Sequence, residues 1–123
     1  MAEVGVIIVA GGSGRRMGGT LPKQFMILGN EPILARSINR IREALPKAEI
    51  VVVLPEAHVA MWQNLAARFD VAPHKIAFGG SERFHSVKNG IDALSDDVRI
   101  IAVHDGVRPM VSKKLIIKLI LEA

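Results

Sequence analysis

The sequence lacks cysteine and tyrosine, has only one tryptophan and four phenylalanines, and contains no apolar run as long as a membrane span. Without cysteine, disulfide scaffolds, thiolate zinc sites and cysteine nucleophiles are excluded, and nothing indicates an oxidising compartment. A membrane-spanning helix needs about 20 apolar residues, and the first residues lack the basic segment of a signal peptide. We therefore expect a cytoplasmic protein that is neither exported nor inserted in a membrane.

Positive charge is in modest excess, with 16 lysines and arginines against 12 acidic residues, a net charge of +4 and a pI near 9.9. The few aromatic residues and the absence of a Lys/Arg block leave no stacking platform or basic tail for nucleic acid. A small anionic ligand fits this composition better. Because 50% of the 123 residues are hydrophobic, we expect residues 1–123 to belong to one folded domain with no internal boundary.

Short β-branched runs alternate along the chain with longer segments of helical periodicity. The sequence predicts four strands, at Val4–Ala10, Ile50–Leu54, Lys75–Phe78 and Val98–Val103. It predicts four amphipathic helices, at Pro32–Leu45, Glu56–Phe69, Ser81–Leu94 and Ser112–Glu122. The first, second and fourth strands are almost uninterrupted aliphatic runs, as in strands covered on both faces. This order indicates an α/β fold, a three-layer α/β/α sandwich with a mostly parallel sheet, whose ligands bind beyond the carboxyl ends of the strands.

The loop after the first strand, residues 11–24, combines glycine with positive charge. Glycine occupies three of its first four positions, and the loop carries three cations, Arg16 and Lys23 among them, but no acid. Glycines let backbone amides approach an anion closely, so the loop predicts a polyphosphate site. It matches neither the P-loop nor the dinucleotide-binding G-x-G-x-x-G spacing. A flexible surface loop with solvated cations is the alternative.

Two further loops follow strands at the same edge of the sheet. Gly80 and Ser81 follow the third strand, and Ser86 lies one turn into the next helix, where backbone groups and a hydroxyl can read a nucleobase edge. The alternative is a tight turn with Ser81 as the N-cap. Asp105 and Gly106 follow the fourth strand, and an acid beside a cationic loop suits Mg²⁺. A simple turn is the alternative there.

The histidines predict no metal site. His58, His74 and His85 are scattered at spacings that metal sites do not use, so we expect them on the surface. His104, at the end of the fourth strand, is interpreted as a hydrogen-bonded histidine without a catalytic role.

Four motifs in this order, Ala10–Met17, Pro22–Phe25, Gly79–Ser86 and His104–Pro109, together resemble the 2-C-methyl-D-erythritol 4-phosphate cytidylyltransferase family. These are the nucleotidyltransferases of non-mevalonate isoprenoid biosynthesis. The resemblance implies a Rossmann-like fold, CTP as cosubstrate and Mg²⁺ as cofactor. It also implies transfer of CMP to a sugar-alcohol phosphate with release of pyrophosphate.

The resemblance implies roles for individual residues. Arg16 and Lys23 match the catalytic pair that stabilises charge on the α-phosphate, and Asp105 matches the metal side of the site. The residues matching nucleotide-binding positions are Ala10, Gly11, Gly12, Gly80, Ser81, Ser86, Asp105 and Gly106.

Members of this family are roughly twice as long as this chain. Their second half supplies a dimerisation arm and an Arg and a Lys that position the acceptor phosphate. We therefore expect the chain to be the N-terminal, nucleotide-binding part, inactive alone, of a protein that forms a homodimer at full length. A ribitol 5-phosphate cytidylyltransferase, which shares two of the motifs, is one alternative. A non-catalytic nucleotide-binding module is the other, if the chain is naturally this short.

Overall fold

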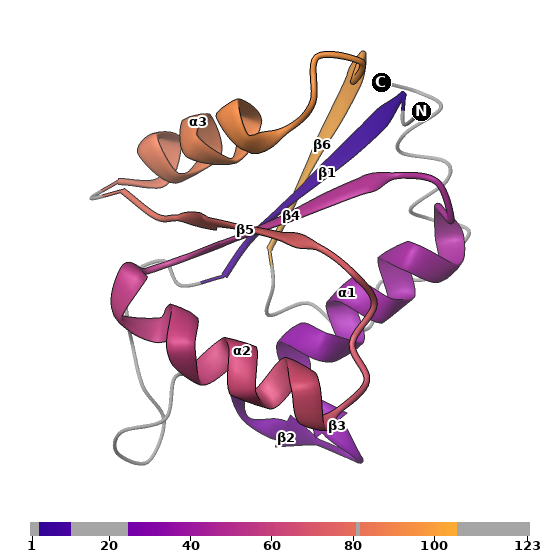
Figure 1. Cartoon of the computed structure of the whole chain (residues 1–123), viewed down its shortest axis with the longest axis vertical. Coiled ribbons are helices and arrows are strands. Elements are labelled where there is room, and N and C mark those ends of the chain that lie inside the picture. Colours follow the sequence, from indigo (N-terminus) through magenta and orange to yellow (C-terminus); the bar gives the residue numbers. More distant parts are fainter. Residues whose placement is uncertain (1–2, 11–24, 81, 106–123) are drawn as a thin grey trace.

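The computed structural model describes residues 3–10, 25–80 and 82–105, and its central feature is a four-stranded parallel sheet (Figure 1). The strands of this sheet are β1 (Val4–Val9), β4 (Glu49–Leu54), β5 (Lys75–Phe78) and β6 (Ile100–Asp105). Their order across the sheet is β5-β4-β1-β6, and every neighbouring pair is parallel. The predicted α/β class and parallel sheet are confirmed.

Helices cover both faces of this sheet. They are α1 (Ile33–Ala44), the 3₁₀ turn η2 (Glu56–His58), α2 (Val59–Arg68) and α3 (Arg83–Ala93). Figure 1 shows α1 and α2 on one side of the strands and α3 on the other, which gives the three predicted layers. The predicted fourth helix, Ser112–Glu122, lies outside the described residues.

Three predicted elements need corrected boundaries. β6 begins at Ile100 rather than Val98, because the Val98 amide closes a turn on the Ser95 carbonyl and the strand then pairs with β1 from Val4 onward. It ends at Asp105 rather than Val103, because pairing with β1 continues to Val9, so Asp105 lies in the strand and does not follow it. The predicted helix Glu56–Phe69 begins with the 3₁₀ turn η2. Helix α3 begins at Arg83 rather than at Ser81, and Glu82 lies at its N-cap position, so the alternative in which Ser81 caps the helix is wrong.

A small hairpin was not predicted. Its strands β2 (Ile27–Leu28) and β3 (Glu31–Pro32) are antiparallel and joined through Gly29, whose φ is +72°. Glycine takes this left-handed conformation without the steric cost of a Cβ atom. The Ile33 amide then donates to the Met26 carbonyl at 3.0 Å, so the hairpin leads directly into α1.

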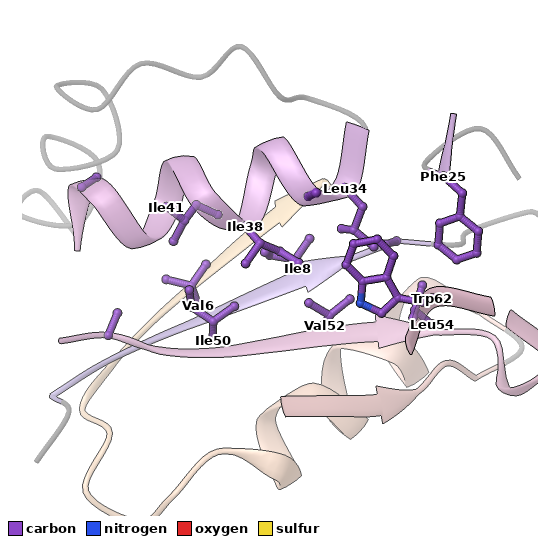
Figure 2. Packing of buried hydrophobic residues seen from close by; sticks show 14 residues of the cluster. Val6, Ile8, Phe25, Leu34, Ile38, Ile41, Ile50, Val52, Leu54 and Trp62 are labelled. Carbon is purple, nitrogen blue, oxygen red and sulfur yellow. The ribbon is translucent and has the colours of Figure 1, made fainter. Parts of the chain in front are cut away.

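The larger core lies between the sheet and helices α1 and α2 (Figure 2). Ile8 of β1, Val52 of β4 and Ile38 of α1 are fully buried there. At one end, the Trp62 and Phe25 rings stack with centroids 5.6 Å apart and an interplanar angle of 17°. Burial of such large side chains contributes about 2–3 kcal/mol each, so this layer holds the strands rigidly.

On the opposite face, α3 packs closely over the sheet. Ile7, Val51 and Val53 are buried under it, and a Cβ added to Gly90 would lie 2.7 Å from Ile7 Cγ2. The sequence predicted that the fourth strand is covered on both faces, and this prediction is wrong for the described residues. Ile101 and Val103 are 40% and 42% exposed, because β6 lies at the edge of the sheet that the described residues form and α3 packs over β5, β4 and β1.

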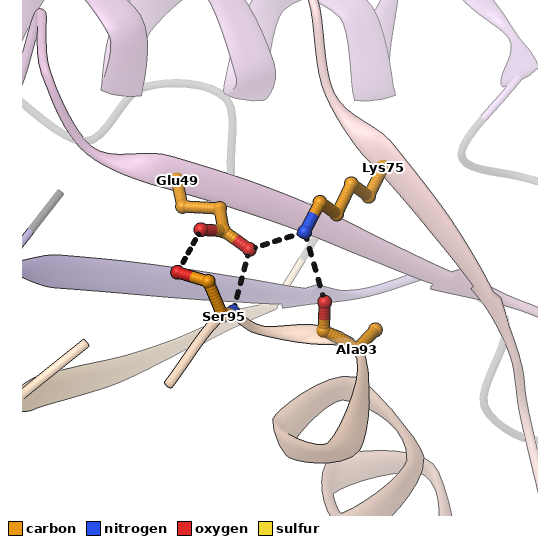
Figure 3. A network of polar contacts seen from close by, with 4 residues as sticks. All are labelled: Glu49, Lys75, Ala93 and Ser95. Carbon is orange, nitrogen blue, oxygen red and sulfur yellow. Dashed lines mark hydrogen bonds and ion pairs between the residues drawn. The ribbon is translucent and has the colours of Figure 1, made fainter. Parts of the chain in front are cut away.

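A polar network ties the carboxyl end of α3 to the sheet (Figure 3). Glu49 Oε1 accepts hydrogen bonds from Lys75 Nζ at 2.7 Å and the Ser95 amide at 2.9 Å, and its Oε2 accepts from Ser95 Oγ at 2.8 Å. Lys75 Nζ also donates to the carbonyl of Ala93, the last residue of α3, at 3.2 Å. The bond from Lys75, with those from Ser95, holds the pKa of the Glu49 carboxyl below its usual value. The network fixes where α3 ends.

Candidate active site at the carboxyl ends of the strands

The strand order reverses between β1 and β6. From β1 the chain proceeds outward to β4 and β5, and it then returns to the other side of β1 as β6. In open α/β sheets, ligands bind in the crevice that opens beyond the carboxyl ends of the strands at such a reversal. The topology therefore places the candidate site beyond the ends of β1 and β6.

Two of the predicted site residues lie at this reversal. Ala10 follows the last residue of β1, and Asp105 is the last residue of β6, where it is the register partner of Val9. Ala10 is 1% exposed, and its amide donates to the Val53 carbonyl of β4 at 2.9 Å. The structure thus brings the start of the glycine-rich loop and the predicted metal ligand to adjacent strand ends.

The segment Phe78–Gly80, here called the β5 loop, is held from two sides. The Gly79 amide donates to the Leu54 carbonyl at the end of β4 at 2.7 Å, and the Gly80 amide donates to Ser86 Oγ at 3.1 Å. Ser86 is buried, whereas Gly80 is exposed. Two of the three predicted base-reading residues, Gly80 and Ser86, are therefore in direct contact, and the Ser86 hydroxyl orients the loop from within α3.

Only glycine fits at position 80. A Cβ added there would lie 2.2 Å from His85 Cβ, a separation that real Cβ atoms do not show. The backbone of the β5 loop at Gly80 therefore packs directly against the side chain of His85 in the first turn of α3.

Several predicted residues lie outside the described part of the chain: Gly11, Gly12, Arg16, Lys23, Ser81 and Gly106. For Asp105 the strand position is described, and its side chain is not. Among residues 3–10, 25–80 and 82–105, no group of three or more His, Cys, Asp or Glu side chains could hold a metal ion.

Sequence reasoning missed Asn89 of α3. Its Nδ2 donates to the carbonyl of Phe78, the last residue of β5, at 2.9 Å. Asn89 follows Ser86 by three residues, a spacing that places both side chains on the same face of a helix. Two polar residues at this spacing after a glycine-rich turn are the sequence signal that could have identified Asn89.

Two histidines are not on the surface, contrary to the sequence expectation. His58 is 8% exposed, and its ring lies edge-on to Phe25 with centroids 5.9 Å apart. His74 Nε2 accepts a hydrogen bond from Trp62 Nε1 at 3.0 Å, and its Nδ1 lies 2.7 Å from the Ala72 carbonyl, which assigns the proton to Nδ1. Burial lowers the pKa of His74, so its neutral form is favoured in the folded protein. Both histidines serve packing rather than chemistry.

A cavity of about 780 Å³ opens at the opposite, amino end of the strands. We call it the amino-end cavity, and its lining includes Glu3, Lys47, Asp96, Asp97 and Arg99. Ligands of open parallel sheets bind at carboxyl ends, so we assign the chemistry to the β1/β6 edge and not to this cavity.

Across the described residues, the structure has no helix that is both long enough and apolar enough to cross a membrane.

Comparison with known proteins identifies the chain's relatives. A family model described as "2-C-methyl-D-erythritol 4-phosphate cytidylyltransferase" matches residues 4–123. A curated protein of that name from Bacteroides fragilis is 45% identical over 119 residues, which are 95% of this chain and 53% of the relative. The chain thus spans about half the length of the curated relatives it matches.

Solved structures share the fold. The 4-diphosphocytidyl-2C-methyl-D-erythritol synthase from Anaerococcus prevotii superposes with a TM-score of 0.78 at 23% identity, covering 98% of this chain and 51% of the other. Rv0371c from Mycobacterium tuberculosis, solved as a complex with manganese, gives a TM-score of 0.68 at 17% identity and covers 95% of this chain and 56% of the other. At these identities the likeness shows the fold.

Proposed function

The chain belongs to the 2-C-methyl-D-erythritol 4-phosphate cytidylyltransferase family, and we propose that it carries the N-terminal, nucleotide-binding part of such an enzyme. The complete enzyme would transfer CMP from CTP to 2-C-methyl-D-erythritol 4-phosphate and release pyrophosphate, a step of non-mevalonate isoprenoid biosynthesis. The observation that carries the proposal is the placement of Ala10 and Asp105 at the ends of adjacent strands, where the strand order reverses.

The reaction is an in-line displacement at phosphorus. A phosphate oxygen of the acceptor attacks the α-phosphorus of CTP, and the bond from that phosphorus to the oxygen bridging the α- and β-phosphates breaks. Pyrophosphate leaves with the electron pair of that bond. The attacking phosphate is already anionic at neutral pH, so no general base is needed, and catalysis requires positioning and fixed positive charge.

In this proposal the cations of the first loop supply that charge. Arg16 and Lys23 stabilise the negative charge that develops on the α-phosphate, and backbone groups of Ala10, Gly11 and Gly12 border the nucleotide. The hydrogen bond from the Ala10 amide to the Val53 carbonyl of the neighbouring strand β4 supports this placement, because it sets where the loop leaves the sheet.

The other two loops hold the cytidine. Gly80, Ser81 and Ser86 read the base, and Asp105 with Gly106 contacts the ribose. We propose Mg²⁺ as the cofactor, which Asp105 and phosphate oxygens of CTP would hold and which would supply positive charge that stabilises the leaving pyrophosphate. A protein of the same fold has been solved as a complex with manganese, which is consistent with a divalent cation as cofactor.

The proposal extends to partners and location. The full-length protein would be a cytoplasmic homodimer that binds CTP and a sugar-alcohol phosphate, without nucleic acid or membrane as partners. The chain alone would lack transferase activity, since the acceptor-positioning residues implied by the family resemblance belong to the half of the relatives that it does not span.

Pyrophosphate release by the full-length protein tests this function. With CTP and Mg²⁺, we expect release with methylerythritol phosphate and much less with ribitol 5-phosphate, the acceptor of the alternative enzyme. Arg16→Ala and Lys23→Ala should each lower kcat by about 10² or more, with a smaller change in KM for CTP. Equal use of both acceptors would contradict the acceptor assignment, and near-normal turnover of either variant would contradict the role of that residue. No turnover with either acceptor would favour the non-catalytic nucleotide-binding module.

A further inference from the structure

The residues on either side of the loop 11–24 belong to one buried cluster. Ala10 lies before the loop and Phe25 after it, and both are 1% exposed. Trp62 of α2 belongs to the same cluster and is fully buried beside Phe25 (Figure 2). The point where the chain re-enters the core after the loop therefore depends on how Phe25 is held.

Three contacts hold Phe25. Its ring stacks on Trp62, with centroids 5.6 Å apart and an interplanar angle of 17°. The ring of His58 meets it edge-on, with centroids 5.9 Å apart. The carbonyl of the next residue, Met26, accepts the amide of Ile33 at 3.0 Å, which ties the backbone to the start of α1. The stack fixes the side chain, and the backbone bond fixes the direction of the chain.

Trp62 is itself held in one orientation. Its Nε1 donates to His74 Nε2 at 3.0 Å, so the indole cannot turn within its stacking plane without leaving a buried donor unpaired. His74 Nδ1 donates to the Ala72 carbonyl at 2.7 Å, and the Ala72 amide donates to Asn39 Oδ1 of α1 at 2.9 Å. These hydrogen bonds connect the indole to α1, so two helices fix the ring against which Phe25 stacks.

The position of Phe25 matters because Lys23 is only two residues earlier in the sequence. Two residues span at most about 7 Å, so the placement of Phe25 limits where the backbone of Lys23 can lie relative to the sheet. In the proposed reaction, Lys23 stabilises charge that grows in the transition state. A displacement of such a group by about 1 Å can cost 10²-fold in rate.

We propose that Trp62 is a positioning residue for the transfer step: through its stack on Phe25 it fixes the point where the chain re-enters the core after the loop 11–24, and thereby the reach of Lys23. Trp62 is fully buried and acts through Phe25, so it needs no contact with the nucleotide. None of the four motifs that carry the family resemblance includes Trp62. The inference rests on the proposed function, since it requires Lys23 to act on the α-phosphate.

The test uses the full-length protein and two substitutions that remove the stack from either side. Trp62→Leu and Phe25→Leu each keep an apolar side chain in the core and leave only one of the two stacked rings. Ile41→Ala is the matched control, because Ile41 is 2% exposed in the same cluster and lies at the opposite end from Phe25 (Figure 2). Its truncation lowers stability without removing the stack.

Pyrophosphate release with CTP and methylerythritol phosphate gives kcat and KM, and thermal unfolding of each variant sets an assay temperature at which it is folded. We expect each leucine variant to lower kcat by about tenfold or more and to change KM for CTP by less than about threefold, because the misplaced cation acts in the transition state. The double variant should lose no more than the more affected single variant, since both substitutions break the same stack. Ile41→Ala should keep kcat while its melting temperature falls.

Folded leucine variants with the kcat of the wild type would overturn the proposal, even if KM for CTP had risen. An equal loss of kcat in Ile41→Ala would also overturn it, because the effect would then be one of stability alone. If Trp62→Leu does not fold, Phe25→Leu decides by the same criteria. A wild-type protein that does not turn over CTP would instead remove the proposed function itself, so the two failures are distinguishable.

Discussion

Alanine at position 80 tests whether the β5 loop belongs to the nucleotide site. The added Cβ would lie 2.2 Å from His85 Cβ, and ordinary van der Waals contact begins at 3.4 Å, so the two atoms must separate by a further 1.2 Å. Both atoms belong to rigid parts of their residues, so rotation of a side chain cannot relieve the clash. The loop or the first turn of α3 must move.

Misplacement of a positioning group by about 1 Å can cost 10²-fold in rate. We therefore expect Gly80→Ala to lower kcat/KM for CTP by about 10²-fold in the full-length protein, measured by pyrophosphate release. Gly79→Ala is the matched control, since its Cβ would meet Ser86 Oγ at 3.2 Å and no closer atom. Its effect should be at least several-fold smaller.

A second substitution separates geometry from other effects. His85→Gly removes the clashing Cβ, and the nearest remaining atom, the carbonyl carbon of residue 85, lies at 3.4 Å. Adding His85→Gly to Gly80→Ala should therefore restore part of the lost activity, although glycine costs the helix about 1 kcal/mol. CTP kinetics of Gly80→Ala within about threefold of wild type would refute the reasoning, because the clash follows directly from the packing of loop on helix.

Three further predictions concern stability, each measured by denaturation of the protein. Gly90→Ala should destabilise by about 1–2 kcal/mol, because its Cβ would lie 2.7 Å from a β1 isoleucine, and an unchanged unfolding midpoint would contradict this packing. Glu49→Gln should be less stable than wild type above pH 4.5, where the carboxylate that pairs with Lys75 contributes fully, and the difference should shrink as pH falls below 4.5. Burial lowers the pKa of His74 in the folded protein. Below pH 6.5 the unfolded chain therefore binds a proton at His74 more readily than the folded protein does, and the free energy of unfolding should fall as the pH falls. Trp62 fluorescence reports that loss, and a pH-independent midpoint between 7.5 and 5 would exclude it.

The alternation of hydrophobic runs and amphipathic segments predicted the layers, the parallel sheet and most boundaries to within two residues. The span Lys75–Phe78 matches β5 without any shift. The hairpin before α1 was missed because each of its strands has only two residues, too short for a periodic pattern. The exposure of Val103 was missed because an aliphatic run does not show whether its strand lies at the centre or at the edge of a sheet.

In the candidate site, too, the sequence predicted some features and missed those that depend on tertiary packing. Glycine and charge marked the loops, and the rule for carboxyl ends placed them on one edge of the sheet. The contact between Gly80 and Ser86 depends on how α3 packs on the sheet, and so does the hydrogen bond from Asn89 to the Phe78 carbonyl. A sequence pattern carries neither. His58 was misassigned for a related reason, since it is buried in contact with Phe25, which lies 33 residues earlier in the chain.

A crystal structure of the full-length protein with CTP and Mg²⁺ tests the central claim most directly. The account predicts the nucleotide beyond the carboxyl ends of β1 and β6, with the phosphates at the loop that follows Ala10 and the base at Gly80. Nucleotide bound in the amino-end cavity, beside Glu3 and Lys47, would contradict it.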